Sequence, residues 1–178
     1  VAAVANCAVG IELEDRARHH LNTLDNLSVF KKISDIGNGK KFDIITAFHV
    51  LEHLPNPLET LEILKSITLD NGYIVVEVPN SDDALLTLFD SDAFQKFTYW
   101  SQHLFLFNSA NLKTLAKKSG LEVVSVKHVQ RYPLANHLQW LAKNKPGGHQ
   151  DWAFLRSENL DKAYEAQLAG LGITDTIV

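Results

Sequence analysis

The stretch FDIITAFHVLEHLPNP, residues 42–57, is the most informative part of the chain about its fold. It begins with an apolar run of strand length and then places His49, Glu52 and His53 within five positions. A strand that is apolar along its length is typical of a parallel sheet covered on both faces. In open sheets of this kind ligands bind beyond the carboxyl ends of the strands. The stretch therefore predicts a buried strand followed directly by a ligand site.

Strand and helix patterns alternate on both sides of this stretch. The expected strands cover residues 7–13, 27–33, 42–48, 72–78, 121–129 and 174–178. The expected helices cover residues 14–24, 57–71, 81–89, 109–120 and 158–169. The remainder of 131–172 is polar and is expected to be irregular. The alternation indicates a Rossmann-like, doubly wound α/β domain with a mostly parallel sheet.

Composition restricts the classes of function. The chain has 178 residues, of which 46% are hydrophobic and 21% charged, and its formal net charge is −4. These values indicate one globular domain, and no apolar run reaches the 18 residues of a membrane span. The scattered lysine pairs argue against nucleic acid and favour a small-molecule partner. Cys7 is the only cysteine, which excludes an internal disulfide and indicates a reducing, cytoplasmic compartment.

The segment HVLEH matches H-x-x-E-H, a signature in which two histidines on a helix hold zinc. Pro55 follows His53 by two positions and disfavours a helix continuing through the ligands. No third ligand is apparent in the sequence. We therefore expect no metal, and His49 or His53 could equally bond backbone at a tight strand-to-helix junction.

Other polar residues follow expected strands. A carboxylate at Glu12 can accept hydrogen bonds from a ribose diol, or it can complement the dipole of the next helix. Asp35 is a similar candidate, with a turn-capping role as its alternative. Asn80 follows the strand at 72–78.

The succession VGIELE, SDI, FDIITAFHVLEHLPNP, GYIVVEVPN and YWSQHLFLFNSANLKTLAKKSGLEVV resembles the class I S-adenosylmethionine-dependent methyltransferases. Within that class it resembles the branch with a VLEH segment after the fourth strand. The later segment QRYPLANHLQWLAKNKPGGHQDW is similar to methyltransferases that accompany surface-polysaccharide biosynthesis. The resemblance implies S-adenosylmethionine as cofactor and a sugar or glycan precursor as acceptor.

The resemblance also implies roles for single residues. The residues expected to hold the cofactor are Glu12 at the ribose, Asp35 and Ile36 at the adenine, and Phe48 and His49 near the methionine moiety. The residues expected on the acceptor side are Asn80, Gln102 and His137. A methyl acceptor with a hydroxyl group needs a general base, and His53 and His103 are the leading candidates.

One feature of the family is absent. The class begins with a strand and a G-x-G-x-G loop, and this sequence contains no such loop. The family's strand order is 3-2-1-4-5-7-6, so the absent first strand is a central one. We therefore expect a single partial domain over 1–178, with a cofactor-binding core at 1–130, an acceptor-side segment at 131–172 and the start of the last strand at 173–178.

An absent central strand leaves the strands of Glu12 and Phe48 with unpaired edges. The two strands could pair directly, another chain could fill the gap, or the chain could be marginally stable and oligomerise. We expect a homo-oligomer. Two alternatives to a methyltransferase stay open: a non-catalytic assembly module that keeps the fold, and a nicotinamide-dependent oxidoreductase, which would need the same absent loop.

Overall fold

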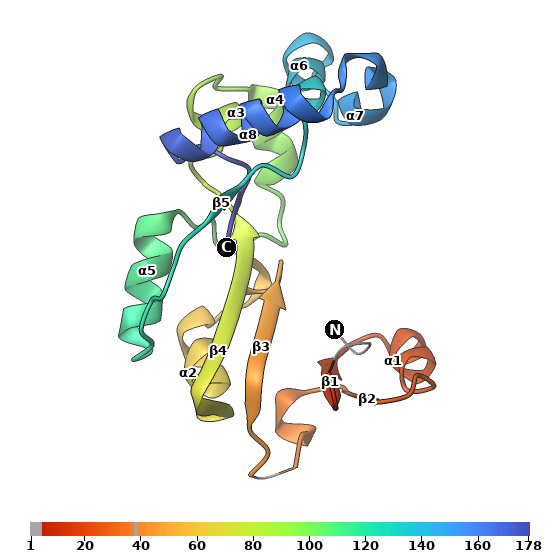
Figure 1. The fold of residues 1–178 in the computed structure, drawn as a ribbon, viewed down its shortest axis with the longest axis vertical. Helices are drawn as coiled ribbons and strands as arrows, with labels where there is room; N and C mark the ends of the chain where they lie inside the picture. The colour runs from red at the N-terminus through yellow and green to blue at the C-terminus, as the bar shows by residue number, and fades with distance from the viewer. Residues whose placement is uncertain (1–4, 38) are drawn as a thin grey trace. The chain divides into compact units, whose positions relative to one another are not determined.

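The computed structural model describes residues 5–37 and 39–178. It consists of two compact units that meet in sequence at Lys41 and Phe42, and each unit has a sheet of its own (Figure 1). Among the described residues, no helix is both long enough and apolar enough to cross a bilayer.

The first unit is a small βαβ arrangement. It contains β1 (Ala8–Ile11), α1 (Asp15–Leu21), β2 (Leu27–Phe30) and the 3-10 helix η1 (Ile33–Asp35). β1 and β2 are parallel. The Asn22 side chain accepts a hydrogen bond from the Val29 N–H at 2.7 Å and donates one to the Val29 carbonyl at 3.0 Å. These two bonds attach the end of α1 to β2.

The second unit contains a four-stranded sheet and most of the helices. Its elements are β3 (Phe42–Phe48), η2 (Leu51–His53), α2 (Pro57–Ser66), β4 (Thr68–Pro79), α3 (Ala84–Thr87), α4 (Asp92–Thr98), α5 (Ser109–Lys118), β5 (His128–Val129), α6 (Leu134–Lys143), α7 (Gly148–Asp151), η3 (Ala153–Leu155), α8 (Glu158–Leu171) and β6 (Thr176–Ile177). The strand order is β3-β4-β6-β5. β3 and β4 are parallel, and β6 is antiparallel to both of its neighbours.

The two sheets confirm the predicted fold class. Their orders, β2-β1 and β3-β4-β6-β5, correspond to the 3-2 and 4-5-7-6 portions of the expected sheet. β1 pairs with β2 within the first unit, and β3 pairs with β4 within the second.

Helices occupy two places in the second unit (Figure 1). α2 packs against β4 and α5, beside the strands. Helices α3, α4, α6, α7 and α8 gather beyond the carboxyl end of β4. There Trp140 is 3% exposed and lies 5.2 Å from the ring centroids of both Phe94 and Phe97.

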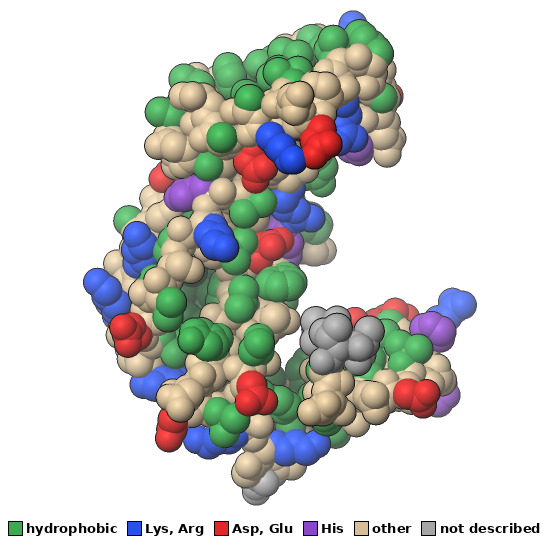
Figure 2. Space-filling model, viewed as in Figure 1, with side chains coloured by type: hydrophobic (Ala, Val, Ile, Leu, Met, Phe, Trp, Pro, Cys, Tyr) green, Lys and Arg blue, Asp and Glu red, His purple; other side chains and the backbone are tan. Residues whose placement is uncertain are grey.

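One face of the β3–β4 pair is not covered within this unit. Figure 2 shows hydrophobic side chains at the surface over these strands. Ile44 is 63% exposed, Tyr73 57% and Phe48 50%, whereas Ala47 on the other face of β3 is 7% exposed. The apolar run at 42–48 therefore forms the expected strand, but within its own unit only one face is buried.

The boundary between α2 and β4 differs from the sequence prediction. The expected helix ends at Asn71-Gly72, whereas α2 ends at Ser66 and β4 begins at Thr68. A β-carbon at Gly72 would lie 2.9 Å from the carbonyl oxygens of Phe42 and Asp43. Gly72 therefore lets the β3 and β4 backbones approach closely, next to a register shift in their pairing. It does not cap the helix.

Two further segments differ from expectation. The strand expected at 121–129 is reduced to His128–Val129, because its neighbour β6 is itself only two residues long. The helix expected at 158–169 is confirmed by α8, but residues 131–157 are largely helical rather than irregular. In this part of the chain, helix α6 buries three polar side chains, Asn136, His137 and Gln139, beside Ala135 and Trp140.

Candidate functional site

His49 lies directly after the carboxyl end of β3. Its backbone N–H donates to the Glu77 carbonyl at 2.8 Å, which is the last bond of the β3–β4 pair. Its φ is 51°, in the left-handed region that residues with a side chain rarely adopt. The chain therefore turns away from the sheet immediately and enters η2, which presents Glu52 and His53.

The Glu52 carboxylate is the centre of a cluster at this end of the sheet. Its side chain is 1% exposed. Oε1 lies 3.3 Å from His49 Nδ1 and 3.8 Å from His53 Nε2, but among the described residues neither carboxylate oxygen accepts a hydrogen bond. A buried carboxylate without hydrogen bonds is costly, so this group needs a nearby positive charge.

His53 and His103 approach the same carboxylate from two segments about fifty residues apart. His53 Nδ1 lies 2.8 Å from the Gln102 carbonyl, and His103 Nδ1 lies 2.9 Å from the Thr98 carbonyl. A carbonyl oxygen only accepts hydrogen bonds, so the proton of each ring is on Nδ1. In the neutral form each ring then presents the lone pair of Nε2.

The backbone holds this geometry together. The Glu52 carbonyl accepts hydrogen bonds from the N–H groups of Leu104 at 2.8 Å and Phe105 at 3.2 Å. The His53 and His103 ring centroids are 5.0 Å apart, and the Trp100 ring lies 5.5 Å from that of His103. The loop after α4 is thereby fixed against η2.

A charged group adjoins the cluster on its β4 side. His49 Nε2 lies 3.0 Å from Glu77 Oε1, and Arg131 Nη1 lies 3.7 Å from the same oxygen. Arg131 also contacts the His49 ring through Nη1. Arg131 thus brings a permanent positive charge from the segment after β5 to the ends of β3 and β4.

Asn80 and His137 belong to a second, buried polar network. Both are 2% exposed. The Asn80 amide donates to the carbonyls of Gly172 and Thr174, at 3.0 and 2.8 Å. His137 Nδ1 lies 2.7 Å from the Tyr164 hydroxyl, and its Nε2 lies 3.1 Å from Gln130 Nε2. Burial lowers the pKa of His137 to about 4, so the ring is neutral at pH 7.

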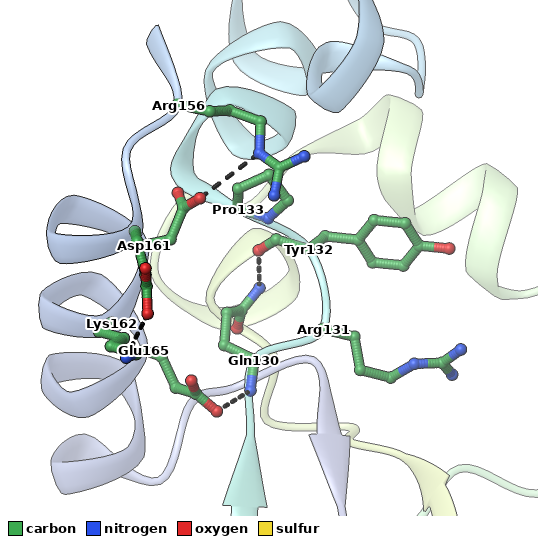
Figure 3. A pocket seen from close by; sticks show the side chains of 9 residues that line it. Gln130, Arg131, Tyr132, Pro133, Arg156, Asp161, Lys162 and Glu165 are labelled. Atoms are coloured by element: carbon green, nitrogen blue, oxygen red, sulfur yellow. Dashed lines mark hydrogen bonds and ion pairs between the residues drawn. The ribbon is translucent and has the colours of Figure 1, made fainter. Parts of the chain in front are cut away.

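A shallow pocket of about 300 Å³ lies between the segment after β5 and α8 (Figure 3). Asp161, Lys162 and Glu165 line it from α8, whereas the side chains of Arg131 and Tyr132 point away from that helix. Its lining contains three basic and three acidic residues, namely Arg131, Arg156, Lys162, Glu158, Asp161 and Glu165. The pocket therefore does not favour a ligand of one charge.

The residues expected at the cofactor lie in both units. Glu12 follows β1, and its Oε1 accepts the Glu14 N–H at 2.8 Å. Asp35 is exposed and accepts the Lys32 N–H at 3.1 Å, a turn-capping bond, and Ile36 is 8% exposed. Phe48 is half-exposed at the end of β3.

The structure thus brings together His49, His53, His103 and the Gln102 backbone, and it places Asn80 and His137 in a separate network. Glu52 was noted in the sequence beside the two histidines but was assigned no role, and Glu77 was missed. A carboxylate inside the apolar strand YIVVEV was a signal for Glu77. Nothing in the sequence pointed to Arg131, because its approach depends on the path of the chain after β5.

A comparison with known protein families identifies the family of the chain. Residues 3–126 match a family model described as a methyltransferase domain. The chain belongs to this methyltransferase-domain family. A comparison with curated proteins gave no significant match.

Solved methyltransferases have the same fold. A SAM-dependent methyltransferase from Archaeoglobus fulgidus has a TM-score of 0.58 and 18% identity, with 95% of this chain and 72% of that chain covered. The methyltransferase in complex with the Haloferax volcanii Trm112 activator has a TM-score of 0.59 and 13% identity, with coverages of 87% and 68%. The plantazolicin methyltransferase BpumL, solved with a pentazolic desmethylPZN analogue and SAH, has a TM-score of 0.52 and 17% identity, with coverages of 96% and 65%. At the level of the family, these findings confirm S-adenosylmethionine as the predicted cofactor.

Proposed function

We propose that this methyltransferase domain transfers a methyl group to the hydroxyl group of a small molecule, a sugar or a glycan precursor. The observation that carries the proposal is the cluster of His49, Glu52, His53 and His103 at the carboxyl end of β3. In open α/β sheets this is where ligands bind. The Rossmann-like sheet and the family match give the cluster its methyltransferase context.

Five residues would hold the cofactor, which supplies a methyl group on a sulfonium centre. Glu12 fits the ribose diol, because the Glu14 N–H occupies only one of its two oxygens. Asp35 and Ile36 would bind the adenine, and Phe48 and His49 the methionine moiety. The sequence has no glycine-rich loop, so the fit of these residues to the cofactor is partial.

When no metal ion is bound, either His53 or His103 would take the proton of the acceptor hydroxyl. Their Nδ1 atoms are held by backbone carbonyls, which orients the basic Nε2 atoms and leaves their lone pairs to accept a proton. Holding a catalytic group in the right orientation lowers the barrier to reaction, because the entropy of bringing it into place is lost in advance.

The three acceptor-side residues would act in different ways. Gln102 is exposed, its backbone carbonyl lies 2.8 Å from His53 Nδ1 and it directly precedes His103, so we propose that its side chain contacts the acceptor. Asn80 and His137 are buried, and their polar atoms are bonded within the protein. We propose that they support the acceptor side by holding β4, α6 and α8 in place.

We also propose a cytoplasmic location and a homo-oligomer. The free, exposed Cys7 supports a reducing compartment. The exposed apolar face of β3 and β4 supports association.

Calorimetric titration of S-adenosylhomocysteine into the chain tests the cofactor role. We expect binding, and we expect Glu12→Ala to weaken it about tenfold or more, because a hydrogen bond to a charged group contributes about 1.5–3 kcal/mol. Glu14→Ala is the matched control, since Glu14 is a neighbouring exposed carboxylate.

If Glu12→Ala binds S-adenosylhomocysteine with unchanged affinity, Glu12 does not contact the cofactor. A wild-type chain that binds no S-adenosylhomocysteine would favour the second candidate, a non-catalytic module that keeps the fold. The absence of the glycine-rich loop is the observation in favour of that module. If binding is found, transfer to sugars and sugar nucleotides is the next assay.

A further inference from the structure

We propose that Glu52, His53 and His103 bind a divalent transition-metal ion of the zinc class. The proposal does not rest on methyltransferase activity. All three residues lie in the second unit, and binding of the ion can be measured without an activity assay. One ligand atom from each residue lies within 4.8 Å of the other two.

The chemistry of the two rings points to a cation between them. Because both Nδ1 atoms face carbonyl oxygens, both Nε2 atoms present lone pairs when the rings are neutral. His53 Nε2 is 3.8 Å from a Glu52 oxygen that is itself only an acceptor. Acceptors that face one another at this distance repel unless a positive charge lies between them.

The buried carboxylate is the second and independent observation. The Glu52 side chain is 1% exposed, and neither oxygen accepts a hydrogen bond from the described residues. A metal ion would satisfy this carboxylate and both imidazole lone pairs together. The two carbonyl bonds to Nδ1 then have the function that such bonds have in known metal sites, where they fix the tautomer and orientation of the ligand.

The set of donors selects the ion. Two imidazole nitrogens and one carboxylate form a ligand set found in catalytic zinc sites, and it leaves a coordination position for water or an acceptor oxygen. Magnesium and calcium prefer all-oxygen sites. The site also differs from the H-x-x-E-H signature. His49 lies between the carboxylates of Glu52 and Glu77, at 3.3 and 3.0 Å, and His103 takes its place as the third ligand.

A bound ion would change the role of the two histidines. It would occupy both Nε2 lone pairs, so the rings would hold the ion and would no longer accept a proton. The ion would then polarise a hydroxyl group at its open position. In the metal-free chain the alternative source of positive charge is protonation of one imidazole.

The test is titration of the untagged, metal-free chain with Co²⁺ and Zn²⁺, followed by calorimetry and by the visible absorption of the cobalt form. We expect one equivalent to bind, and we expect Glu52→Gln and His103→Ala each to weaken binding at least about tenfold. Mg²⁺ should not compete. His20→Ala, an exposed histidine on α1, is the matched control and should bind as the wild type does.

Circular dichroism of each variant checks that it is folded, and the near-isosteric Glu52→Gln keeps the test valid if His103→Ala unfolds. Equal affinity in wild type and Glu52→Gln, or no binding to the wild type, would overturn the proposal. A chain that binds Co²⁺ but no S-adenosylhomocysteine would support the metal site and contradict the methyltransferase proposal. A chain that binds S-adenosylhomocysteine but no Co²⁺ would support the cofactor role and overturn the metal site.

Discussion

At the scale of single residues, Asp83 and His137 are two buried groups with displaced pKa values. Burial, together with the nearby Asp175 carboxylate, raises the pKa of Asp83 to about 7. Asp83 caps α3 by accepting the Leu85 N–H. Burial lowers the pKa of His137 to about 4. The two groups therefore make stability depend on pH in opposite directions.

The direction follows from which state binds more protons. Between about pH 4 and pH 7 native Asp83 retains a proton that the unfolded chain loses, so its contribution to stability falls as pH rises. Between about pH 6.5 and pH 4 the unfolded chain protonates His137 and the native chain does not, so that contribution falls as pH decreases.

Substitution of Asp83 isolates its contribution to the pH dependence of stability. We expect the melting temperature of Asp83→Asn, relative to wild type, to rise steadily from pH 4.5 to pH 7.5, because Asn keeps the cap and removes the titration. The difference in the free energy of unfolding between variant and wild type changes by at most about 1.4 kcal/mol per pH unit. Asp70 is an exposed carboxylate in β4, and Asp70→Asn is the matched control. Its melting temperature should change with pH as that of the wild type does. Parallel curves for Asp83→Asn would mean that this carboxyl titrates normally.

At the scale of elements, the junction of α2 and β4 depends on one close contact. Gly72 lies where a β-carbon would meet Thr68 Cγ2 at 2.7 Å and two backbone carbonyl oxygens at 2.9 Å. Asn-Gly in a sequence is a typical helix stop, and this is why the sequence places the boundary wrongly. The strand pairing with β3 decides the conformation of this segment.

A pair of glycine substitutions tests this explanation. We expect Gly72→Ala to destabilise the chain by about 1–3 kcal/mol, as overpacking does in well-packed cores. Gly170→Ala in α8 meets nothing within 4 Å and should be neutral or stabilise by up to about 1 kcal/mol. Chemical denaturation of both variants measures the difference. A Gly72→Ala chain as stable as wild type would show that the close contact relaxes freely.

At the scale of the whole molecule, β3 and β4 expose an apolar face within their own unit. The homo-oligomer expected from the sequence stays a prediction, and exposed Ile44, Phe48 and Tyr73 support it. Apolar side chains gathered in this way commonly mark an interaction surface.

Size-exclusion chromatography with light scattering tests the oligomer. We expect the wild-type chain to elute with the mass of at least two copies, and we expect Ile44→Thr to shift the population toward the monomer, because it removes apolar area and keeps a β-branched side chain. Val124→Thr is the matched control, since Val124 is 74% exposed and lies outside the strands. A monomeric wild type would contradict the prediction.

Most of the strands, several helices and the family follow from the amino-acid sequence alone, because they depend on patterns within short stretches. The apolar strand at 42–48, the polar residues that follow it and the alternation with helices are enough to indicate the α/β fold. Helix α6 was missed because Asn136, His137 and Gln139 share its buried face with Ala135 and Trp140. The strand at β5 was predicted too long because its length depends on a neighbouring strand.

Which of the polar residues share a site depends on tertiary contacts. His103 reaches Glu52 and His53 because the Leu104 and Phe105 N–H groups bond to the Glu52 carbonyl. Asn80 and His137 lie apart in a buried network, although the sequence gives them the same polar character. Contacts between segments fifty residues apart follow from packing and backbone hydrogen bonds, and no pattern of adjacent residues encodes them.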